Sequence, residues 1–263
     1  HSPFREAWPN ARESHAKRAL RDFPEDATQG QAVTRPMEIT LPMVNRYSHE
    51  IKEDSYGYRV VSAGSRGQAD LNFSIRDYGV GLSASEMEEL ITNAGKSDKT
   101  DDNTYGGGMG IGSLAGFSVS DQIVYTAYKD GLKSSLVLSS DSNAFVASKP
   151  VPTDEEDGVC LSYVIRDVAT AEAFSQGAAE FLAMAPEDER AIIVCDQSTA
   201  ATLSNRKGYT FPRGSKGLHL LESQPNVGSS DSLNIRIDGC FYRGEHKGLV
   251  EKISKAVSEH AAG

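Results

Sequence analysis

A glycine-rich stretch carries the residue types in this chain that point most directly to ligand chemistry. Residues 105–117 (YGGGMGIGSLAGF) hold five glycines within seven positions, followed by small and apolar residues that can start a helix. Glycine permits positive φ and lets backbone approach a ligand closely. Free N–H groups leading into a helix N-terminus bind phosphate. The stretch therefore predicts a phosphate-binding loop, with a flexible surface loop as the alternative.

Two familiar phosphate-binding motifs do not fit this stretch. A Walker A loop needs G-x-x-x-x-G-K-[ST], and Leu90 stands where Gly95-Lys96-Ser97 would require the first glycine. The dinucleotide fingerprint G-x-G-x-x-G also fails, because Gly116 comes one residue too late after Gly110-x-Gly112. The loop is therefore of another kind.

A carboxylate precedes two glycines at the end of a predicted strand. Residues 70–76 (DLNFSIR) alternate apolar and polar, which predicts a half-buried strand, and Asp77-Tyr78-Gly79-Val80-Gly81 follows it. Ser83 and Glu86 then form a capping box for a helix. Its apolar face holds Met87, Leu90, Ile91 and Ala94. An Asp in a turn is common, but this order of elements before a glycine-rich loop favours a binding site.

The N-terminal segment 4–21 is predicted to be a helix, with Phe4, Ala7, Trp8, Ala11 and Ala19 as a weak apolar stripe. Glu6, Asn10 and Glu13 share one face of it. A carboxylate and an amide one turn apart can orient a water and complete the shell of Mg²⁺. The alternative is an ordinary polar helix face. Pro9 inside the helix would normally kink it.

Composition excludes several other classes of protein. The 263 residues carry a net charge of −10, which disfavours bulk nucleic-acid binding. The basic run Arg12, Lys17, Arg18 and Arg21 is interpreted as a solvated helix face. Three cysteines far apart argue against a zinc site or a disulfide framework. No apolar run approaches 18 residues and no signal peptide is evident, so we expect a cytoplasmic protein without a transmembrane segment.

The remaining patterns predict an α/β fold. Residues 95–106 lack an apolar face, so we expect a mobile loop there that acts as a lid. Asp130-Gly131 is a strong hairpin signal. Predicted strands are Met37–Leu41, Tyr56–Val61, 121–129, 132–138 and 159–165, with a loop or hairpin around Asn45–Ser55. Together they predict a two-layer α/β sandwich with a mixed, mostly antiparallel sheet and helices on one face.

The pattern changes after residue 166, and we expect two domains, 1–166 and 167–263. The second is predicted to be a smaller α+β domain, transducer-like or partial. Its predicted elements are a helix at 168–184, a strand at Ala191–Cys195, a loop at 200–217, a hairpin at 232–243 around Asp238-Gly239 and a terminal helix at 248–261.

The three motifs together resemble the N, G1 and G2 boxes of the GHKL (Bergerat-fold) ATPases, which include gyrase B, the heat-shock-ninety chaperones, MutL and histidine-kinase catalytic domains. The closest likeness is to the phage rIIA-type (rapid-lysis A) proteins. The resemblance covers roughly residues 1–130. It is carried by Arg5-Glu6-x-x-x-Asn10-x-x-Glu13-Ser14-His15, by residues 76–83 (RDYGVGLS), by Ser97-x-Lys99, by residues 107–113 (GGMGIGS) and by residues 117–121 (FSVSD).

The resemblance implies a role for each matching residue. Glu6 would be the general base that activates water, and Asn10 would ligate Mg²⁺. Asp77 would accept the adenine amino hydrogen, with Gly81 allowing close approach of the base, and Lys99 in the lid would reach a phosphate. The implied ATP-binding set is completed by Gly79, Gly107, Gly108, Met109, Gly110, Ile111, Gly112 and Ser113.

The resulting hypothesis is an ATPase that uses ATP and Mg²⁺. Lid closure would control dimerisation or another homo-oligomer, and the protein would act in the host cytoplasm during phage infection with a host or phage protein partner. A non-hydrolysing nucleotide-sensing or protein-interaction module is the alternative. A histidine-kinase-like phosphotransferase is disfavoured, because no helix with an acceptor histidine is evident and we expect His15 and His260 to face solvent.

Overall fold

The structure is a computed structural model that describes ten segments of the chain. They are residues 3–22, 35–44, 50–53, 59–62, 69–92, 112–141, 145–183, 191–204, 233–237 and 240–244. None of the helices in these segments is both long enough and apolar enough to cross a membrane.

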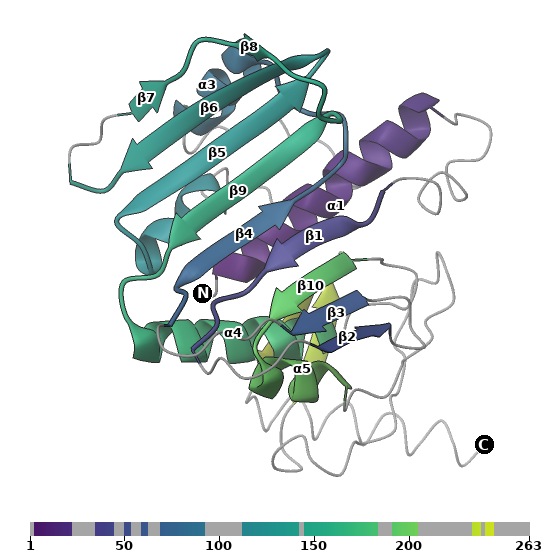
Figure 1. Cartoon of the computed structure of the whole chain (residues 1–263), viewed down its shortest axis with the longest axis vertical. Coiled ribbons are helices and arrows are strands. Elements are labelled where there is room, and N and C mark those ends of the chain that lie inside the picture. Colours follow the sequence, from purple (N-terminus) through teal and green to yellow (C-terminus); the bar gives the residue numbers. More distant parts are fainter. Residues whose placement is uncertain are drawn as a thin grey trace, which may run out of the picture.

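A large mixed sheet forms the centre of the fold (Figure 1). In spatial order its strands are β2 (Glu50–Glu53), β3 (Arg59–Ser62), β10 (Ala191–Cys195), β1 (Met37–Thr40), β4 (Asn72–Arg76), β9 (Gly158–Val164), β5 (Gln122–Lys129), β6 (Leu132–Ser139) and β7 (Phe145–Ala147), and β8 (Val151–Pro152) also pairs with β6. β10 runs parallel to β1 and β3, and the other pairs of this sheet are antiparallel.

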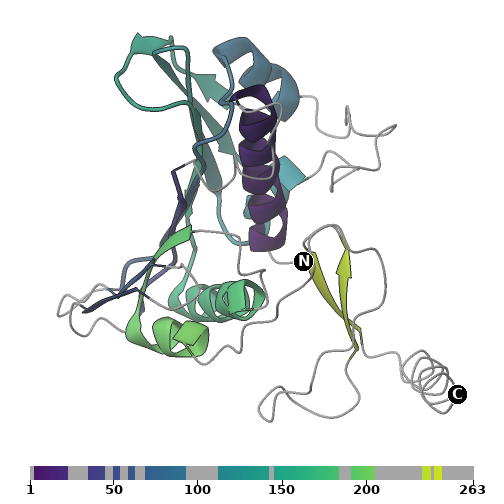
Figure 2. The same ribbon diagram turned by 90° about the vertical axis from the view of Figure 1, so that its right-hand side faces the viewer.

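The helices pack on one face of this sheet. Figure 2 shows α1 (Pro3–Asp22), α3 (Ala84–Thr92) and α4 (Val168–Ala183) on the same side of the strands. An aromatic cluster joins the two layers, because the ring centroid of Phe73 on β4 lies 6.1 Å from that of Phe4 on α1 and 5.0 Å from that of Phe174 on α4. The predicted stripe of α1 is buried in this core. The predicted two-layer α/β arrangement is therefore confirmed.

Local signals in the sequence correspond to the observed turns and caps. Asp130 and Gly131 have φ of 54° and 72°, so both central residues of the β5–β6 hairpin are left-handed. Ser83 and Glu86 form the predicted capping box, since the Ser83 N–H donates to Glu86 at 2.7 Å and the Glu86 N–H to the Ser83 hydroxyl at 3.3 Å. α1 continues through Pro9 as one helix.

The expected domain boundary after residue 166 does not coincide with a boundary of the sheet. β10 lies between β3 and β1, and α4 contributes Phe174 and Phe181 to the same core as α1. The predicted loop at 200–217 is wrong in its first part, because α5 (Gln197–Ser204) continues to residue 204.

The predicted hairpin near the C-terminus forms a separate two-stranded sheet. β11 (Leu233–Ile237) pairs with β12 (Cys240–Gly244) in antiparallel register. The predicted helix at 248–261 lies outside the described residues. A second domain in this part of the chain stays a prediction.

Candidate functional site

Asp77 lies where β4 ends, and its side chain is buried, with 5% of its surface exposed. Its Oδ1 accepts hydrogen bonds from the Gly79 N–H at 2.9 Å and from the Ser14 hydroxyl at 3.0 Å. Burial raises the pKa of Asp77 to about 6, against these hydrogen bonds and the positive charge of Arg76, which lower it. At pH 7 the group is therefore mostly an ionised, buried acceptor.

Three side chains from consecutive turns of α1 hold the segment that contains Asp77. We call Ser14, His15 and Arg18 the α1 clamp. His15 Nε2 accepts the N–H of Tyr78 at 2.8 Å, and Arg18 Nη1 donates to the Tyr78 carbonyl oxygen at 2.7 Å. The clamp thus bonds the carboxylate of Asp77 and both peptide groups of Tyr78. The N-terminal motif Arg5–His15 and the D-x-G-x-G segment are therefore in direct contact.

His15 was expected to face solvent, and this prediction is wrong. It is 9% exposed, and its ring lies against the segment that follows β4, where it bonds Tyr78. Burial, followed by the charges of Arg18 and Arg76, lowers its pKa to about 4. A neutral imidazole that accepts at Nε2 carries its proton on Nδ1. Arg18 likewise is not simply part of a solvated face, because its guanidinium bonds to Tyr78.

Gly79 and Gly81 allow two close approaches within the fold. A Cβ on Gly79 would lie 2.0 Å from the Ser14 Oγ, so only glycine lets α1 pack against this turn. Gly81 has φ of 66°, and a Cβ there would lie 2.1 Å from the carbonyl oxygen of Tyr128 on β5. Both glycines are thus required by the chain's own backbone, and their roles toward a nucleotide stay predictions.

A buried arginine supports the other side of this segment. Arg76 is 8% exposed, and it donates to the carbonyl oxygens of Asp77 at 2.6 Å and Glu156 at 2.5 Å. Its guanidinium carbon lies 4.6 Å from the ring centroid of Tyr78 and 4.1 Å from that of Tyr128. Since these contacts are cation–π interactions, Arg76 ties β4 to β5 and supplies positive charge near the Asp77 carboxylate.

The candidate catalytic residues precede the clamp along the same helix. Asn10 precedes Ser14 by four residues and Glu6 by eight, so their Cα atoms lie about 6 Å and about 12 Å from that of Ser14 along the axis. Glu6 is half-buried and Asn10 is exposed. Glu13 forms an ion pair with Lys17 at 2.8 Å. The residues predicted to share a face of α1 thus lie on the helix that contacts Asp77 through Ser14.

The end of the glycine-rich stretch is a 3₁₀ helix, η1 (Gly112–Ser118), which contacts α1. Arg166 holds its C-terminal end, because the guanidinium donates to the carbonyl oxygens of Phe117 at 2.8 Å and Ser120 at 3.0 Å. It also bonds Asp121 at 2.7 Å. The helix that the sequence predicted after the glycines is therefore present, and it lies against the helix that carries Glu6 and Asn10.

Part of the predicted binding set and the predicted lid at 95–106 lie outside the described residues. The site residues concerned are Lys99, Gly107, Gly108, Met109, Gly110 and Ile111, whereas Gly112 and Ser113 open η1. In the described segments no group of three or more His, Cys, Asp or Glu side chains could hold a metal ion. A metal near Asn10 would therefore need oxygens from a ligand or water, as Mg²⁺ commonly uses.

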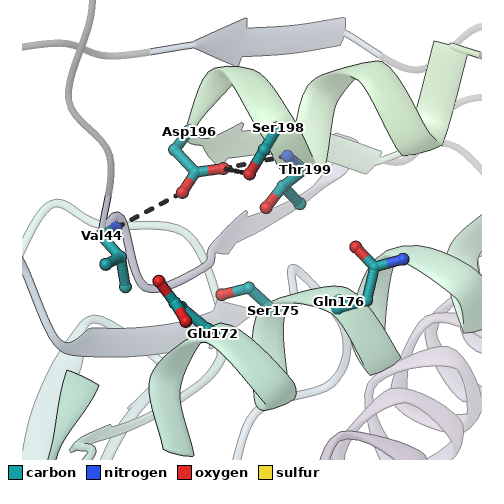
Figure 3. A pocket seen from close by; sticks show the side chains of 7 residues that line it. All are labelled: Val44, Glu172, Ser175, Gln176, Asp196, Ser198 and Thr199. Atoms are coloured by element: carbon teal, nitrogen blue, oxygen red, sulfur yellow. Dashed lines mark hydrogen bonds between the residues drawn. The ribbon is translucent and has the colours of Figure 1, made fainter. Parts of the chain in front are cut away.

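A cavity of about 180 Å³ lies elsewhere, between α4 and α5 (Figure 3). Its lining residues are Val44, Glu172, Ser175, Gln176, Asp196, Ser198 and Thr199. Asp196 accepts the Thr199 N–H and the Ser198 hydroxyl, both at 2.9 Å, so it caps α5. None of the predicted site residues lines this cavity, and Ser175, Asp196 and Ser198 make hydrogen bonds within the fold. We therefore place the candidate site at Asp77.

Part of the chain matches a known protein family. Residues 59–165 match the family described as histidine kinase-, DNA gyrase B- and HSP90-like ATPases. The match spans β3 to β9, including Asp77, the glycine-rich stretch and η1, but not α1. It covers less than half of the chain, supports the GHKL resemblance for this segment, and supports ATP binding. No curated protein matches the chain.

The structure adds residues whose roles sequence reasoning missed. The N-terminal motif Arg5–His15 contains Ser14 and His15 but gives neither a role in the site, and no sequence motif contains Arg166. Ser14 lies four residues after Asn10 on the same helix face, which is a signal that could have placed its hydroxyl beside the site. No local pattern in the sequence indicates the role of Arg166, because its acceptors lie 45 to 49 residues earlier in the chain.

Proposed function

We propose that this protein binds ATP with Mg²⁺ and hydrolyses the ATP. The observation that carries the proposal is the hydrogen bond between Ser14 and Asp77. It joins the helix that bears Glu6 and Asn10 to the buried acceptor of the D-x-G-x-G segment. η1 packs on the same helix, so the described ends of all three motifs meet along α1.

The donor set fits a nucleotide. An ionised, buried carboxylate accepts hydrogen bonds only, so Asp77 suits the amino group of adenine. The glycine-rich stretch would supply backbone N–H groups to the phosphates. The distance of about 12 Å along α1 from Ser14 to Glu6 allows the base and the terminal phosphate of an extended nucleotide to be bound along one helix.

The two polar residues near the start of α1 have separate roles in this proposal. Asn10 would hold Mg²⁺ together with phosphate oxygens and water. Glu6 would orient the attacking water and take its proton. When bound, Mg²⁺ would neutralise phosphate charge. Phosphoryl transfer to water depends mainly on positioning and charge stabilisation, which matches a site built from one carboxylate, one amide and backbone groups.

The wider role rests on the motif resemblance to rIIA-type proteins. In this proposal, ATP closes a lid at 95–106 and controls dimerisation, Lys99 contacts a phosphate, and the protein acts on a host or phage partner in the host cytoplasm. Sedimentation with and without a non-hydrolysable ATP analogue tests the dimerisation. A sedimentation coefficient unchanged at saturating analogue would contradict it.

A non-hydrolysing nucleotide sensor is the second candidate. The observation that favours it is the contrast along α1, since the clamp fixes Asp77 whereas Glu6 and Asn10 make no side-chain hydrogen bond or ion pair within the described residues. Parallel assays of ATP binding and phosphate release, each with Mg²⁺ and with EDTA, separate the two. Mg²⁺-dependent release supports the ATPase. Saturable binding without release supports the sensor, and no binding contradicts both.

A further inference from the structure

We infer that the Ser14 hydroxyl positions the Asp77 carboxylate for hydrogen bonding to the amino group of a nucleotide base, an inference that rests on the proposed ATP binding. Ser14 would then be a positioning residue, because it acts through Asp77. It would also connect base recognition to the helix that bears Asn10 and Glu6.

The geometry around Oδ1 carries this inference. The Ser14 hydroxyl and the Gly79 N–H donate to the same oxygen, at 3.0 Å and 2.9 Å, from two different elements of the fold. Two donors on one oxygen fix the rotation of the carboxylate about its χ2 axis. A Cβ on Gly79 would lie 2.0 Å from the Ser14 Oγ, which shows how closely the hydroxyl packs against this turn.

The electrostatics around Asp77 make the role of Ser14 measurable. Burial raises the pKa of Asp77 to about 6, and the hydrogen bond from Ser14 opposes that increase. Without the hydroxyl the ionised form loses a donor, so the pKa of Asp77 should increase further. A hydrogen bond to a charged group contributes about 1.5–3 kcal/mol, equivalent to a change of at least about one pH unit.

The charged and titratable neighbours of Asp77 keep one state around pH 6. His15 on α1 has a pKa of about 4 and is therefore neutral near pH 6. The other charged neighbours, Arg18 and Arg76, are guanidinium groups. Burial raises the pKa of the Cys160 thiol on β9 above its ordinary value, so it stays neutral as well. A titration near pH 6 that follows the Asp77 resonance therefore reports Asp77 itself.

The first measurement follows the ¹³C resonance of the Asp77 carboxyl during a pH titration of the ligand-free protein. The variants are Ser14→Ala and a matched control, Ser175→Ala, whose hydroxyl makes a buried 2.9 Å hydrogen bond to the Pro42 carbonyl oxygen in another part of the fold. Ser14→Ala should move the midpoint upward by about one pH unit, whereas Ser175→Ala should leave it unchanged. Equal midpoints in wild type and Ser14→Ala would overturn the inference.

The second measurement is the pH dependence of ATP affinity for the same proteins. If the midpoint moves from about 6 to about 7, the ionised fraction at pH 6.5 falls about threefold, and affinity should fall at least as much. Wild-type protein that binds no ATP would contradict the proposed function. Wild-type binding whose pH profile is unchanged in Ser14→Ala would contradict this inference alone. If Ser14→Ala does not fold, Ser14→Cys, which keeps a side chain of similar size with a weak donor, should show the same upward direction.

Discussion

The two ends of the α1 polar face differ in how firmly the fold holds them. Around Ser14, three side chains bond to Asp77 and Tyr78 at 2.7 to 3.0 Å. Toward the start of the helix, Glu6 is half-buried and Asn10 is exposed, and within the described residues neither makes a side-chain hydrogen bond or ion pair.

In the proposed function, this difference separates recognition of the base at the Asp77 end from catalysis at the Glu6 end. A carboxylate held by donors before a ligand arrives loses little freedom on binding, so the Asp77 end is preorganised for selective contact. The Glu6 end keeps its polar groups available for a ligand, a metal ion or water. If the account is right, substitutions at the two ends should change different measurable quantities, and the following variants test that separation.

The largest effect is expected for Glu6→Ala. Removing a general base typically lowers the rate by about 10²–10⁴-fold, so Mg²⁺-dependent phosphate release should fall by this factor. ATP affinity should change less than about twofold, because within the described residues Glu6 makes no hydrogen bond or ion pair with the clamp. Phosphate release and calorimetric titration measure the two quantities. A loss of ATP affinity as large as the loss of phosphate release would show that the two ends of α1 are not separable.

The next effect is expected for Gly79→Ala. The added Cβ would meet both the Oγ and the backbone carbon of Ser14, at 2.0 Å and 2.4 Å, and would push α1 from the turn. Overpacking of this kind costs about 1–3 kcal/mol or more. The matched control is Gly177→Ala on α4, where a Cβ meets nothing within 4 Å and helix propensity should stabilise the protein slightly. Urea unfolding measures both, and equal stability of the two variants would contradict the tight packing described for the clamp.

His15→Gln should change how stability depends on pH. The folded pKa of about 4 lies below the ordinary value of 6.5. The unfolded chain therefore binds more protons between these values, and the stability of wild type falls as pH falls from 6.5 to 4. By pH 4.5 this loss amounts to about 2–3 kcal/mol.

The glutamine side chain in His15→Gln does not titrate and can still accept the Tyr78 N–H, so the variant should lack this loss. Asp77 has the opposite sign, because its folded pKa is raised, and its loss of stability occurs as pH rises toward 6. Because both proteins contain Asp77, its contribution to the pH dependence of stability largely cancels when the two proteins are compared. Unfolding curves from pH 7 to pH 4.5 measure the difference. Parallel pH profiles of wild type and variant would refute the buried, neutral His15.

The smallest effect is expected for Arg166→Ala, which removes the anchor of η1. Since the side chain is 42% exposed, we expect a loss of about 1 kcal/mol or less in unfolding free energy. We also expect a modest loss of ATP affinity through the phosphate loop. Arg21→Ala is the control, because its described bonds reach only the adjacent Asp22. If both variants bind ATP as wild type does, η1 needs no such anchor.

The elements with local signals were predictable from the sequence. The alternation at 70–76, the Asp130-Gly131 turn and the Ser83–Glu86 capping box all depend on neighbours within a few residues, and the structure contains each of them. The polar face of α1 was also visible, since residues four apart on a helix share a face whatever the rest of the chain does.

The parts of the fold and of the site that the sequence did not predict depend on contacts between distant segments. β10 lies parallel between β3 and β1, and a five-residue apolar run does not indicate which strands it will join. His15 is polar, and only the packing of α1 on the end of β4 makes it a buried acceptor. The strands on the two sides of the predicted boundary after residue 166 belong to one sheet, because β10 pairs with β1 and β3.

The most direct test of the central claim is a calorimetric titration of Mg·ATP into wild type, Asp77→Asn and Asp196→Asn. Asp196 is a matched control, because it is also buried, at 4% exposed, but lines the cavity between α4 and α5. We predict saturable binding that Asp77→Asn weakens by about ten- to a hundredfold, since a hydrogen bond to a charged acceptor contributes about 1.5–3 kcal/mol, and that Asp196→Asn leaves unchanged. Wild-type affinity in Asp77→Asn, or a loss confined to Asp196→Asn, would contradict the account.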